Sequence, residues 1–351
     1  MPVCSLGRRL ISWLNPIRAT LTIVLDPAVA AVRLAVRESL APLEGSGSVV
    51  LVALSGGPDS LALAAAAAHE GPKLGLRVAS ATIDHGLQQG SAEVAARAVE
   101  AAREVGIADA RVVRVEVGTE GGPEAAAREA RYAALSRLAV GVDAAAVLLG
   151  HTLDDQAETV LLALARGAGA GSLQGMAPRR VDELGTAWIR PLLGIRREQT
   201  RAFCAASGLE AWTDPHNAET RFARVRARER VLPVLETELG PGIAEALART
   251  AEQLREDNEA FADMIDETIE DIVEHAEAGI AVSAAALAAN PAAIRNRIIR
   301  HVAQSEFGVS LTRTQTLEIA RLATDWRGQG PIDLPVFEAT RQGGMIVMRA
   351  R

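Results

Sequence analysis

The stretch that decides the fold is VVLVALSGGPDSLALAAAAAHE, residues 49–70. In it, a β-branched apolar run is followed by an Ala/Leu-rich helical run, with the Gly-rich turn SGGPDS between them. Gly56 and Gly57 allow the backbone of this turn to approach a ligand closely, and Pro58 pre-sets φ for a first helical turn. Backbone N–H groups and the helix dipole then favour an anion at this helix N-terminus.

The same turn carries an aspartate where a nucleotide-binding loop usually carries a lysine. A mononucleotide P-loop ends in Gly-Lys-Ser/Thr, and residues 55–60 lack that ending. Asp59 beside a phosphate makes sense if Mg²⁺ bridges the two, because hard oxygen ligands suit that ion. The alternative is a capped strand–helix turn that binds no ligand.

Strand-like and helical runs alternate through the first half of the chain. Strands are expected at 49–54, 77–84, 110–117 and 144–150, and helices at 59–69, 91–105, 123–139 and 153–166. This alternation predicts an α/β fold built on a doubly wound parallel sheet that is covered on both faces. A strand and helix at WIRPLL and RREQTRAFCAASG complete this domain, and the Gly-rich segment GAGAGSLQGM before them is expected to be a mobile surface loop.

Composition favours a globular cytoplasmic protein of two or more domains. The chain has 351 residues, of which 49% are hydrophobic and 23% are charged, and no run approaches the roughly 18 apolar residues of a membrane helix. Its two cysteines, Cys4 and Cys204, fit a reducing compartment. Residues 1–25 do not qualify as a signal peptide, and we expect a disordered tail or a segment outside the natural chain.

Charge is distributed unevenly and helps to divide the rest of the chain. Residues 179–230 hold 11 arginines against 7 acidic residues, whereas residues 236–277 hold 14 acidic residues against 2 arginines. We expect an ATPase domain at 26–214, an Arg-rich linker at 215–242, and a smaller, mainly helical C-terminal domain at 243–351. The last domain is expected to begin with a long helix to about 278 and to end in a hairpin near Gly343 and Gly344.

Polar residues follow two of the expected strands, at the sheet edge where open α/β folds bind ligands. Asp84 and His85 follow the second strand, and turn formation is the alternative role for them. GHTLDDQAET follows the fourth strand, from Gly150 and His151 to Glu158. Thr152 with Asp155 resembles a capping box, but the acids at 154, 155 and 158 repel one another unless a cation binds them. We expect this segment and SGGPDS to face each other across one crevice.

Arginines supply candidate contacts to phosphate. Arg128 and Arg131, in EAAAREARY, either reach a phosphate or serve as a helical ion pair with Glu124 beside a core tyrosine. The run RFARVRARER suits an RNA backbone when it follows a nucleotide domain, with a solvated helix face as the alternative. Its candidate RNA-binding residues are Arg221, Arg224, Arg226 and Arg228.

In these stretches the chain resembles the tRNA(Ile)-lysidine synthetases of the PP-loop ATP pyrophosphatase group, in their short form. The motifs occur in one order between residues 49 and 235: LSGGPDS, IDHGL, EAAAREARY, GHTLDDQAET, RGAGAGSLQGM, RPLL and WTDPHN…RFARVRARERVLP. Val225 departs from the family, since many relatives carry asparagine there. The resemblance implies an adenine nucleotide alpha-hydrolase-like Rossmann domain, with ATP and Mg²⁺ as cofactors.

The resemblance also implies a reaction. ATP would adenylate the C2 oxygen of the wobble cytidine of tRNA(Ile) with a CAU anticodon. Free L-lysine would then attack C2, so that AMP leaves and the tRNA reads AUA. Catalytic candidates are Asp59, Asp154, Asp155, Glu158 and Arg128, with Asp59 and Asp155 as metal ligands. Nucleotide-binding candidates are Ser55, Gly56, Gly57, Pro58, Asp59, Ser60, Asp84, His85, Gly150 and His151.

Three alternatives and several details stay open. A 2-thiolating enzyme of the same group would need paired cysteines near the site, and an amidating ligase would need an ammonia source. A non-catalytic nucleotide- or RNA-binding module is the third alternative, although binding alone does not require so many acidic residues. The pattern does not assign one carboxylate to lysine and another to metal, does not explain how methionine tRNA is rejected, and leaves a homodimer open.

Overall fold

The computed structural model describes residues 25–86, 90–118, 122–212, 219–276 and 279–351. The expected N-terminal tail, apart from Leu25, and residues 213–218, which include most of the WTDPHN motif, lie outside the described residues. The chain forms two compact units. The first consists of Met1–Gly150 with Val181–Thr213, and the second of His151–Arg180 with Asp214–Arg351.

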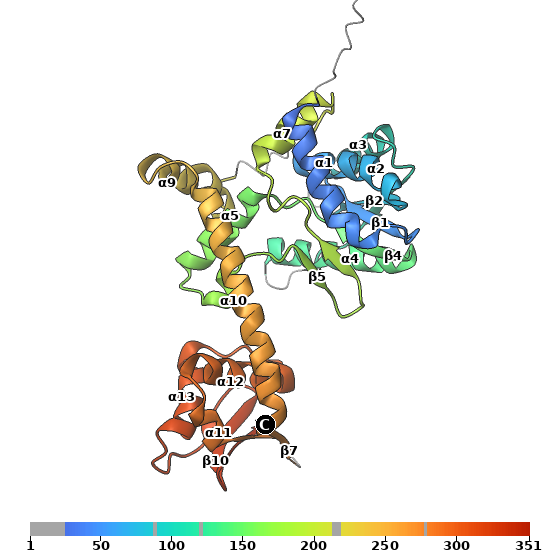
Figure 1. Ribbon diagram of the computed structural model, residues 1–351. Helices are drawn as coiled ribbons and strands as arrows, with labels where there is room; N and C mark the ends of the chain where they lie inside the picture. Colours follow the sequence, from blue (N-terminus) through green and yellow to red (C-terminus); the bar gives the residue numbers. More distant parts are fainter. Residues whose placement is uncertain (1–24, 87–89, 119–121, 213–218, 277–278) are drawn as a thin grey trace, which may run out of the picture. The chain divides into compact units, whose positions relative to one another are not determined.

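A six-stranded sheet in the order β3-β2-β1-β4-β6-β5 forms the centre of the first unit (Figure 1). Strands β1 to β4 and β6 pair in parallel, as a doubly wound fold requires. The strand order reverses between β1 and β4, which places a ligand crevice at the carboxyl ends of these two strands. The strands are β1 (Val49–Ala53), β2 (Arg77–Asp84), β3 (Asp109–Arg114), β4 (Ala144–Leu148), β5 (Arg179–Val181) and β6 (Ala187–Ile189).

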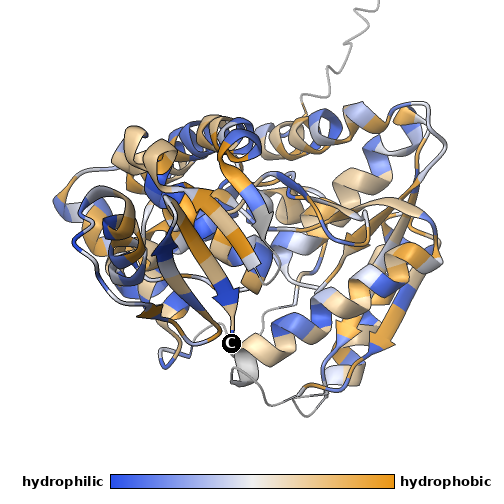
Figure 2. Ribbon diagram, turned by 90° about the horizontal axis from the view of Figure 1, so that it is seen from below, coloured by the Kyte–Doolittle hydropathy of each residue, from blue (hydrophilic) through white to orange (hydrophobic). Residues whose placement is uncertain are grey.

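Helices cover both faces of this sheet. One face buries Val50 and Val52 of β1 against α1, α2, α3 and α7, and the other buries Val49 and Leu51 against α4. Figure 2 shows the resulting concentration of hydrophobic residues on strands. The helices are α1 (Pro27–Leu40), η1 (Ala41–Leu43), α2 (Pro58–Glu70), η2 (Pro72–Leu74), α3 (Ser91–Glu104), α4 (Pro123–Gly141) and α7 (Arg197–Ala206).

The predicted α/β fold class is confirmed, and its elements agree with the expected ranges to within a few residues. Asp26 is the N-cap of α1, since its carboxylate accepts hydrogen bonds from the amides of Ala28 and Val29. No helix among the described residues is both long enough and apolar enough to span a membrane.

The long helix α10 (Ile243–Ile272) connects two cores of the second unit (Figure 1). Its first half packs with Leu153 and Ala157 of α5 and with Leu232 of α9. Its second half contributes Ile265 and Ile272 to the C-terminal core. The other helices are α5 (Leu153–Ala165), α6 (Ala170–Leu173), α8 (Ala223–Arg226), η4 (Ala227–Val231), α9 (Leu232–Glu238), α11 (Ala284–Ala289), α12 (Ala292–Phe307) and α13 (Arg313–Thr324).

The C-terminal region contains more β-structure than the sequence pattern indicates. The expected hairpin is present as β10 (Phe337–Gln342) and β11 (Met345–Ala350), but it forms part of a five-stranded sheet in the order β7-β8-β11-β10-β9. The long helix ends at Ile272 rather than near 278, because the chain continues as β7 and pairs with β8. The added strands are β7 (Val273–Ala276), β8 (Gly279–Ser283) and β9 (Ile332–Asp333).

Two segments have structural features beyond their expected assignments. The linker at 215–242 contains α8, η4 and α9, and η4 is a π-helical turn. Pro233 has no N–H to donate to the carbonyl four residues earlier, which accounts for the widened turn before it. Residues 151–180, expected in the ATPase domain, group with the C-terminal unit because α5 packs against α10.

Candidate functional site

The SGGPDS turn has the strand–turn–helix form that its sequence predicts. Gly57 is the N-cap of α2 without a side-chain cap, and Pro58 occupies the first helical position. The Ser60 hydroxyl fixes the turn, because it accepts a hydrogen bond from the Ser55 amide (3.1 Å) and donates to the Gly57 carbonyl (3.0 Å). An uncapped helix N-terminus directly after a parallel strand is a site where backbone N–H groups bind an anion.

Glycines let neighbouring segments approach this turn. Gly56 has φ of +84°, and its carbonyl accepts a hydrogen bond from the Trp212 amide at 2.9 Å. Gly150, directly after the fourth strand, lies against the first turn of α2. A Cβ added there would come within 3.1 Å of the Ser60 backbone. The loops after β1 and β4 therefore meet at the expected switch point, and a side chain at 150 would crowd the first turn of α2.

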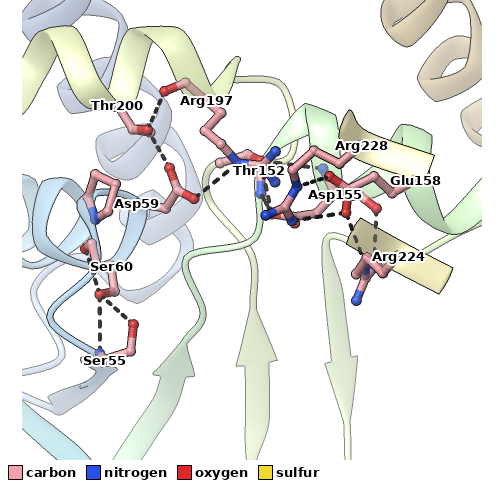
Figure 3. Close-up of polar contacts among 12 residues, drawn as sticks. Ser55, Asp59, Ser60, Thr152, Asp155, Glu158, Arg197, Thr200, Arg224 and Arg228 are labelled. Carbon is pink, nitrogen blue, oxygen red and sulfur yellow. Dashed lines mark hydrogen bonds and ion pairs between the residues drawn. The ribbon is translucent and has the colours of Figure 1, made fainter. Parts of the chain in front are cut away.

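Asp59 is held by residues of α7 that the sequence analysis did not select. The Thr200 hydroxyl donates to Asp59 Oδ1, and Arg197 Nε lies 3.6 Å from Asp59 Oδ2 (Figure 3). Thr200 is fully buried, whereas the Asp59 side chain is 22% exposed. No local motif could have identified these residues, because Thr200 follows Asp59 by 141 positions.

Cys204, on the same face of α7, bears on the thiolation alternative. Its Sγ lies 3.5 Å from the Pro58 carbonyl, and burial, together with the charge of Asp59, raises the pKa of the thiol to about 11. The reactive form of a cysteine is the thiolate. A thiol that stays protonated at neutral pH is a poor sulfur carrier, and Cys204 is the free cysteine among the described residues.

Asp84 and His85 lie at the carboxyl end of β2, but Asp84 acts there as a turn residue. A hydrogen bond from the Ser91 side chain lowers the pKa of the buried Asp84 carboxyl, and the Gly86 amide also donates to it at 3.0 Å. Burial and the nearby Arg131 lower the pKa of His85. Nδ1 of His85 is buried and has no hydrogen-bond partner among the described residues.

Arg128 and Arg131 both lie over the ring of Tyr132. The guanidinium carbons are 4.9 and 5.8 Å from the ring centroid, and Tyr132 also packs on Trp188 at 4.9 Å. Burial lowers the pKa of Arg131, and the charge of Arg128 lowers it further. Tyr132 therefore packs against the core, as one of the two alternatives predicts, and the two arginines cluster on α4. The side chain of Glu124, their proposed ion-pair partner, lies outside the described residues.

In the second unit, the first turn of α5 contains the predicted capping box. The Thr152 amide donates to Asp155 Oδ2 at 2.8 Å, and the Asp155 amide donates to Thr152 Oγ1 at 3.4 Å. Asp155 therefore has a structural role in addition to any role in binding. Asp154, the preceding residue, is half-buried in the same turn, and His151 lies just before the cap.

Two arginines of the expected RNA-binding run contact acidic residues of α5. Arg228 makes a bidentate pair with Glu158 at 2.7 and 3.1 Å, and Arg224 Nε lies 3.1 Å from the same carboxylate (Figure 3). Arg228 also lies 3.6 Å from Asp155 Oδ1. The cation that the clustered acids require is thus present within the chain.

The other two candidate RNA-binding arginines have local partners. Arg226 Nη1 donates to the carbonyls of Thr220 and Arg221 at 2.9 and 2.7 Å. Arg221 pairs with Glu219 at 2.6 Å and remains largely exposed. Val225, which replaces the asparagine of many relatives, is buried.

The Gly-rich segment, expected as a mobile loop, contains α6 and is joined to α5 and α10 by side-chain hydrogen bonds. Gln156 of α5 exchanges two hydrogen bonds with the Met176 backbone, at 2.7 and 3.0 Å. Arg255 of α10 donates to the carbonyls of Gln174 and Met176, both at 3.1 Å. Gly175 has φ of +63°, and a Cβ there would come within 2.6 Å of Gln156. Neither Gln156 nor Arg255 is predicted as a site residue from the sequence.

The predicted metal ligands can be compared with the donor set that the structure provides. Among the described residues, no group of three or more His, Cys, Asp or Glu side chains is arranged to hold a metal ion. Mg²⁺ often binds through one or two carboxylates together with substrate phosphates. Asp59 fits that mode, since it is partly exposed at a helix N-terminus. Asp155 fits less well, because Thr152 and Arg228 already contact its two oxygens.

Comparison with known proteins agrees with this geometry. A family model described as the PP-loop domain matches residues 32–235, and one described as the TilS substrate binding domain matches residues 283–347. A U34-tRNA thiolase from Methanococcus maripaludis has a similar structure, with a TM-score of 0.56 over 65% of this chain and 80% of that one. At 20% identity, this likeness shows the fold alone.

Curated relatives cover nearly the whole chain. The tRNA(Ile)-lysidine synthase of Leifsonia xyli subsp. xyli is 56% identical over 301 residues, which are 86% of this chain and 89% of the relative. The tRNA(Ile)-lysidine synthase of Thermobifida fusca is 49% identical over 92% of this chain and 98% of its own length. The chain therefore belongs to the tRNA(Ile)-lysidine synthase family.

Proposed function

We propose that this protein ligates L-lysine to C2 of the wobble cytidine in the CAU anticodon of tRNA(Ile), with cleavage of ATP to AMP and diphosphate. The observation that carries the proposal is the uncapped N-terminus of α2, with Gly150 against it at the switch point of the sheet. That arrangement suits a nucleotide phosphate, and relatives that cover most of the chain bear this activity in their names.

The first step would transfer the adenylyl group. Cytosine C2 is an unreactive urea-like carbon, so its oxygen must become a leaving group before an amine can replace it. The C2 oxygen would attack the α-phosphorus of ATP, and the bond to the β-phosphate oxygen would break. Backbone N–H groups at the start of α2 would stabilise the departing diphosphate, because they point at the position where negative charge develops.

Asp59 would contribute to holding Mg²⁺ beside these phosphates, with the Ser55–Ser60 turn as the cradle. When bound, the ion would supply charge neutralisation at the phosphate oxygens. Nδ1 of His85 and the backbone after β2 would contact the nucleoside, and Arg128 would contact phosphate. These assignments follow from the positions of these residues in the first unit, at the start of α2, after β2 and on α4.

The second step would transfer lysine. The ε-amine of free lysine ordinarily has a pKa of about 10.4 and must lose its proton before it attacks C2 and displaces AMP. Asp154, Asp155 and Glu158 are the acidic candidates to bind the lysine ammonium groups. Arg224 and Arg228 already neutralise Glu158, and Thr152 and Arg228 contact the two oxygens of Asp155, so Asp154 is the better candidate for lysine and Glu158 orients the arginines.

An isotope incorporation assay tests the proposal. Purified protein, ATP, Mg²⁺ and radiolabelled lysine would be mixed with a tRNA(Ile) transcript that bears CAU. Label should remain on this RNA and should be absent from a transcript with U at the wobble position. AMP release without lysine incorporation would retain the adenylation step but require another nucleophile. If neither signal appears, the binding-module alternative is favoured.

A further inference from the structure

We propose that Thr200 and Arg197 of α7 are positioning residues, which hold the Asp59 carboxylate in the orientation from which it binds the metal–nucleotide complex. This inference rests on the proposed function, because it assigns Asp59 to that complex. It adds an element, α7, that none of the recognised motifs contains.

Each oxygen of Asp59 has its own partner on α7. The Thr200 hydroxyl donates to Oδ1, while Arg197 Nε lies 3.6 Å from Oδ2. Two contacts on opposite oxygens restrict rotation of the carboxylate about its terminal bond. The side chain is 22% exposed, which leaves it accessible to solvent and ions.

Burial of the threonine does not by itself explain the contact. Thr316 in α13 is also buried, and its hydroxyl donates to the Thr312 carbonyl at 2.8 Å within its own helix. Thr200 differs, because its one hydroxyl proton lies between two acceptors, the Arg197 carbonyl of its own helix at 2.8 Å and the Asp59 carboxylate of another element. A hydrogen bond to a charged acceptor is roughly twice as strong as one to a neutral acceptor.

The face of α7 that makes these contacts is continuous. Arg197, Thr200 and Cys204 follow one another at helical spacing, and Cys204 Sγ lies 3.5 Å from the Pro58 carbonyl, next to Asp59 in the chain. The first turn of α2 is thus held through both its backbone and its carboxylate. Sites whose ligands are fixed before binding avoid the cost of ordering them afterwards.

Paramagnetic Mn²⁺ and α,β-methylene-ATP, which cannot be cleaved between its α- and β-phosphates, provide a test that does not depend on turnover. Bound Mn²⁺ would be counted by electron paramagnetic resonance with saturating analogue on the full-length chain. Thr200→Val removes the hydroxyl at nearly constant volume, Thr200→Ser retains it, and Thr316→Val is the matched buried control. Loss of a charged hydrogen bond predicts that Thr200→Val weakens Mn²⁺ binding about tenfold or more.

Thr200→Ser and Thr316→Val should stay within about twofold of the unsubstituted protein, because both preserve the contact to Asp59. Equal Mn²⁺ affinity in Thr200→Val and the unsubstituted protein would overturn the inference, as would an absence of bound Mn²⁺ in the latter. If Thr200→Val does not fold, as judged by circular dichroism, Arg197→Gln takes its place and should weaken Mn²⁺ binding selectively. Unchanged Mn²⁺ affinity in Arg197→Gln would then overturn the inference. Failure of the proposed function is distinguishable, since lysine incorporation would then be absent while Mn²⁺ binding persists.

Discussion

The Glu158 carboxylate has no exposed surface and receives two guanidinium groups, whereas the Asp59 carboxylate is 22% exposed and contacts a hydroxyl and a more distant guanidinium. Both acids belong to motifs in which the sequence predicts catalytic residues. Their surroundings separate them, because a buried acid that two arginines neutralise has little capacity for another cation. The Asp59 carboxylate, which is partly exposed, can be reached by an ion from solvent. Asp59 is therefore expected to affect chemistry, and Glu158 to affect stability.

The largest effect is expected from Asp59→Ala. Loss of this carboxylate should lower tRNA-dependent AMP formation by about 10³-fold, in the range found when a transition-state charge stabiliser is removed. Binding of tRNA should remain nearly unchanged, because the substitution leaves the arginine run intact. AMP release and filter binding of the RNA measure the two quantities. AMP release at the unsubstituted rate would refute the metal assignment of Asp59.

Glu158→Gln should have the next largest effect, on folding. The substitution leaves Arg224 and Arg228 without this charged partner, and breaking a buried pair costs about 3–5 kcal/mol. Because both arginines are partly exposed and can regain water, we expect about 3 kcal/mol from urea unfolding. The control is Glu219→Gln, which removes the exposed partner of Arg221 and should cost less than about 1 kcal/mol. Equal losses in the two variants would remove the distinction between Glu158 and a surface acid.

Arg224→Ala and Arg228→Ala test whether the Arg-rich run also binds tRNA. If these residues also meet RNA phosphates, each substitution should weaken tRNA binding by about tenfold and reduce the salt slope by about one. Arg221→Ala, at an exposed position, gives the effect of a surface arginine for comparison. A salt slope that does not change in the Arg224 and Arg228 variants would show that their contacts with Glu158 and Asp155 are their whole role.

Local signals predicted the parts of the site that lie within one motif. The glycines, Pro58 and the apolar run before them specify β1, the turn and α2, and the spacing of Thr152 and Asp155 specifies the cap of α5. These features depend on backbone geometry and on neighbours three residues apart, which a sequence displays directly.

Contacts between distant segments were not predictable in the same way. Thr200 and Arg197 lie in a helix with no motif, and their contact with Asp59 depends on how α7 packs beside α2. The partners of Glu158 were among the selected arginines, but the spacing indicated an RNA-facing or solvated run rather than ion pairs. The strands β7 and β8 were missed because β7 follows the helical pattern of α10 without a turn signal.

The smallest expected effect concerns a third carboxylate, Asp182, which neutral groups hold in place of arginine. Its oxygens accept hydrogen bonds from Ser136 Oγ at 3.1 Å, Trp188 Nε1 at 2.9 Å and the amides of Thr186 and Leu184 at 2.9 and 3.0 Å. Burial opposes ionisation, but these donors outweigh it and lower the pKa of Asp182. The charged form is therefore the one that the folded protein stabilises.

The pH dependence of this contribution follows from the direction of the shift. Because the pKa in the folded protein lies below the unfolded value of about 3.9, the contribution is full above that value and is lost as the pH falls through the folded pKa. Asp182→Asn should thus reduce the free energy of unfolding by about 1–2 kcal/mol at pH 7, and by less at pH 3. Urea unfolding of both proteins at several pH values measures the difference. If the loss of unfolding free energy in Asp182→Asn does not depend on pH, the geometry of the side chain, and not its charge, stabilises the turn between β5 and β6. The contrast between charged and neutral partners would then hold only for Glu158 and Asp59.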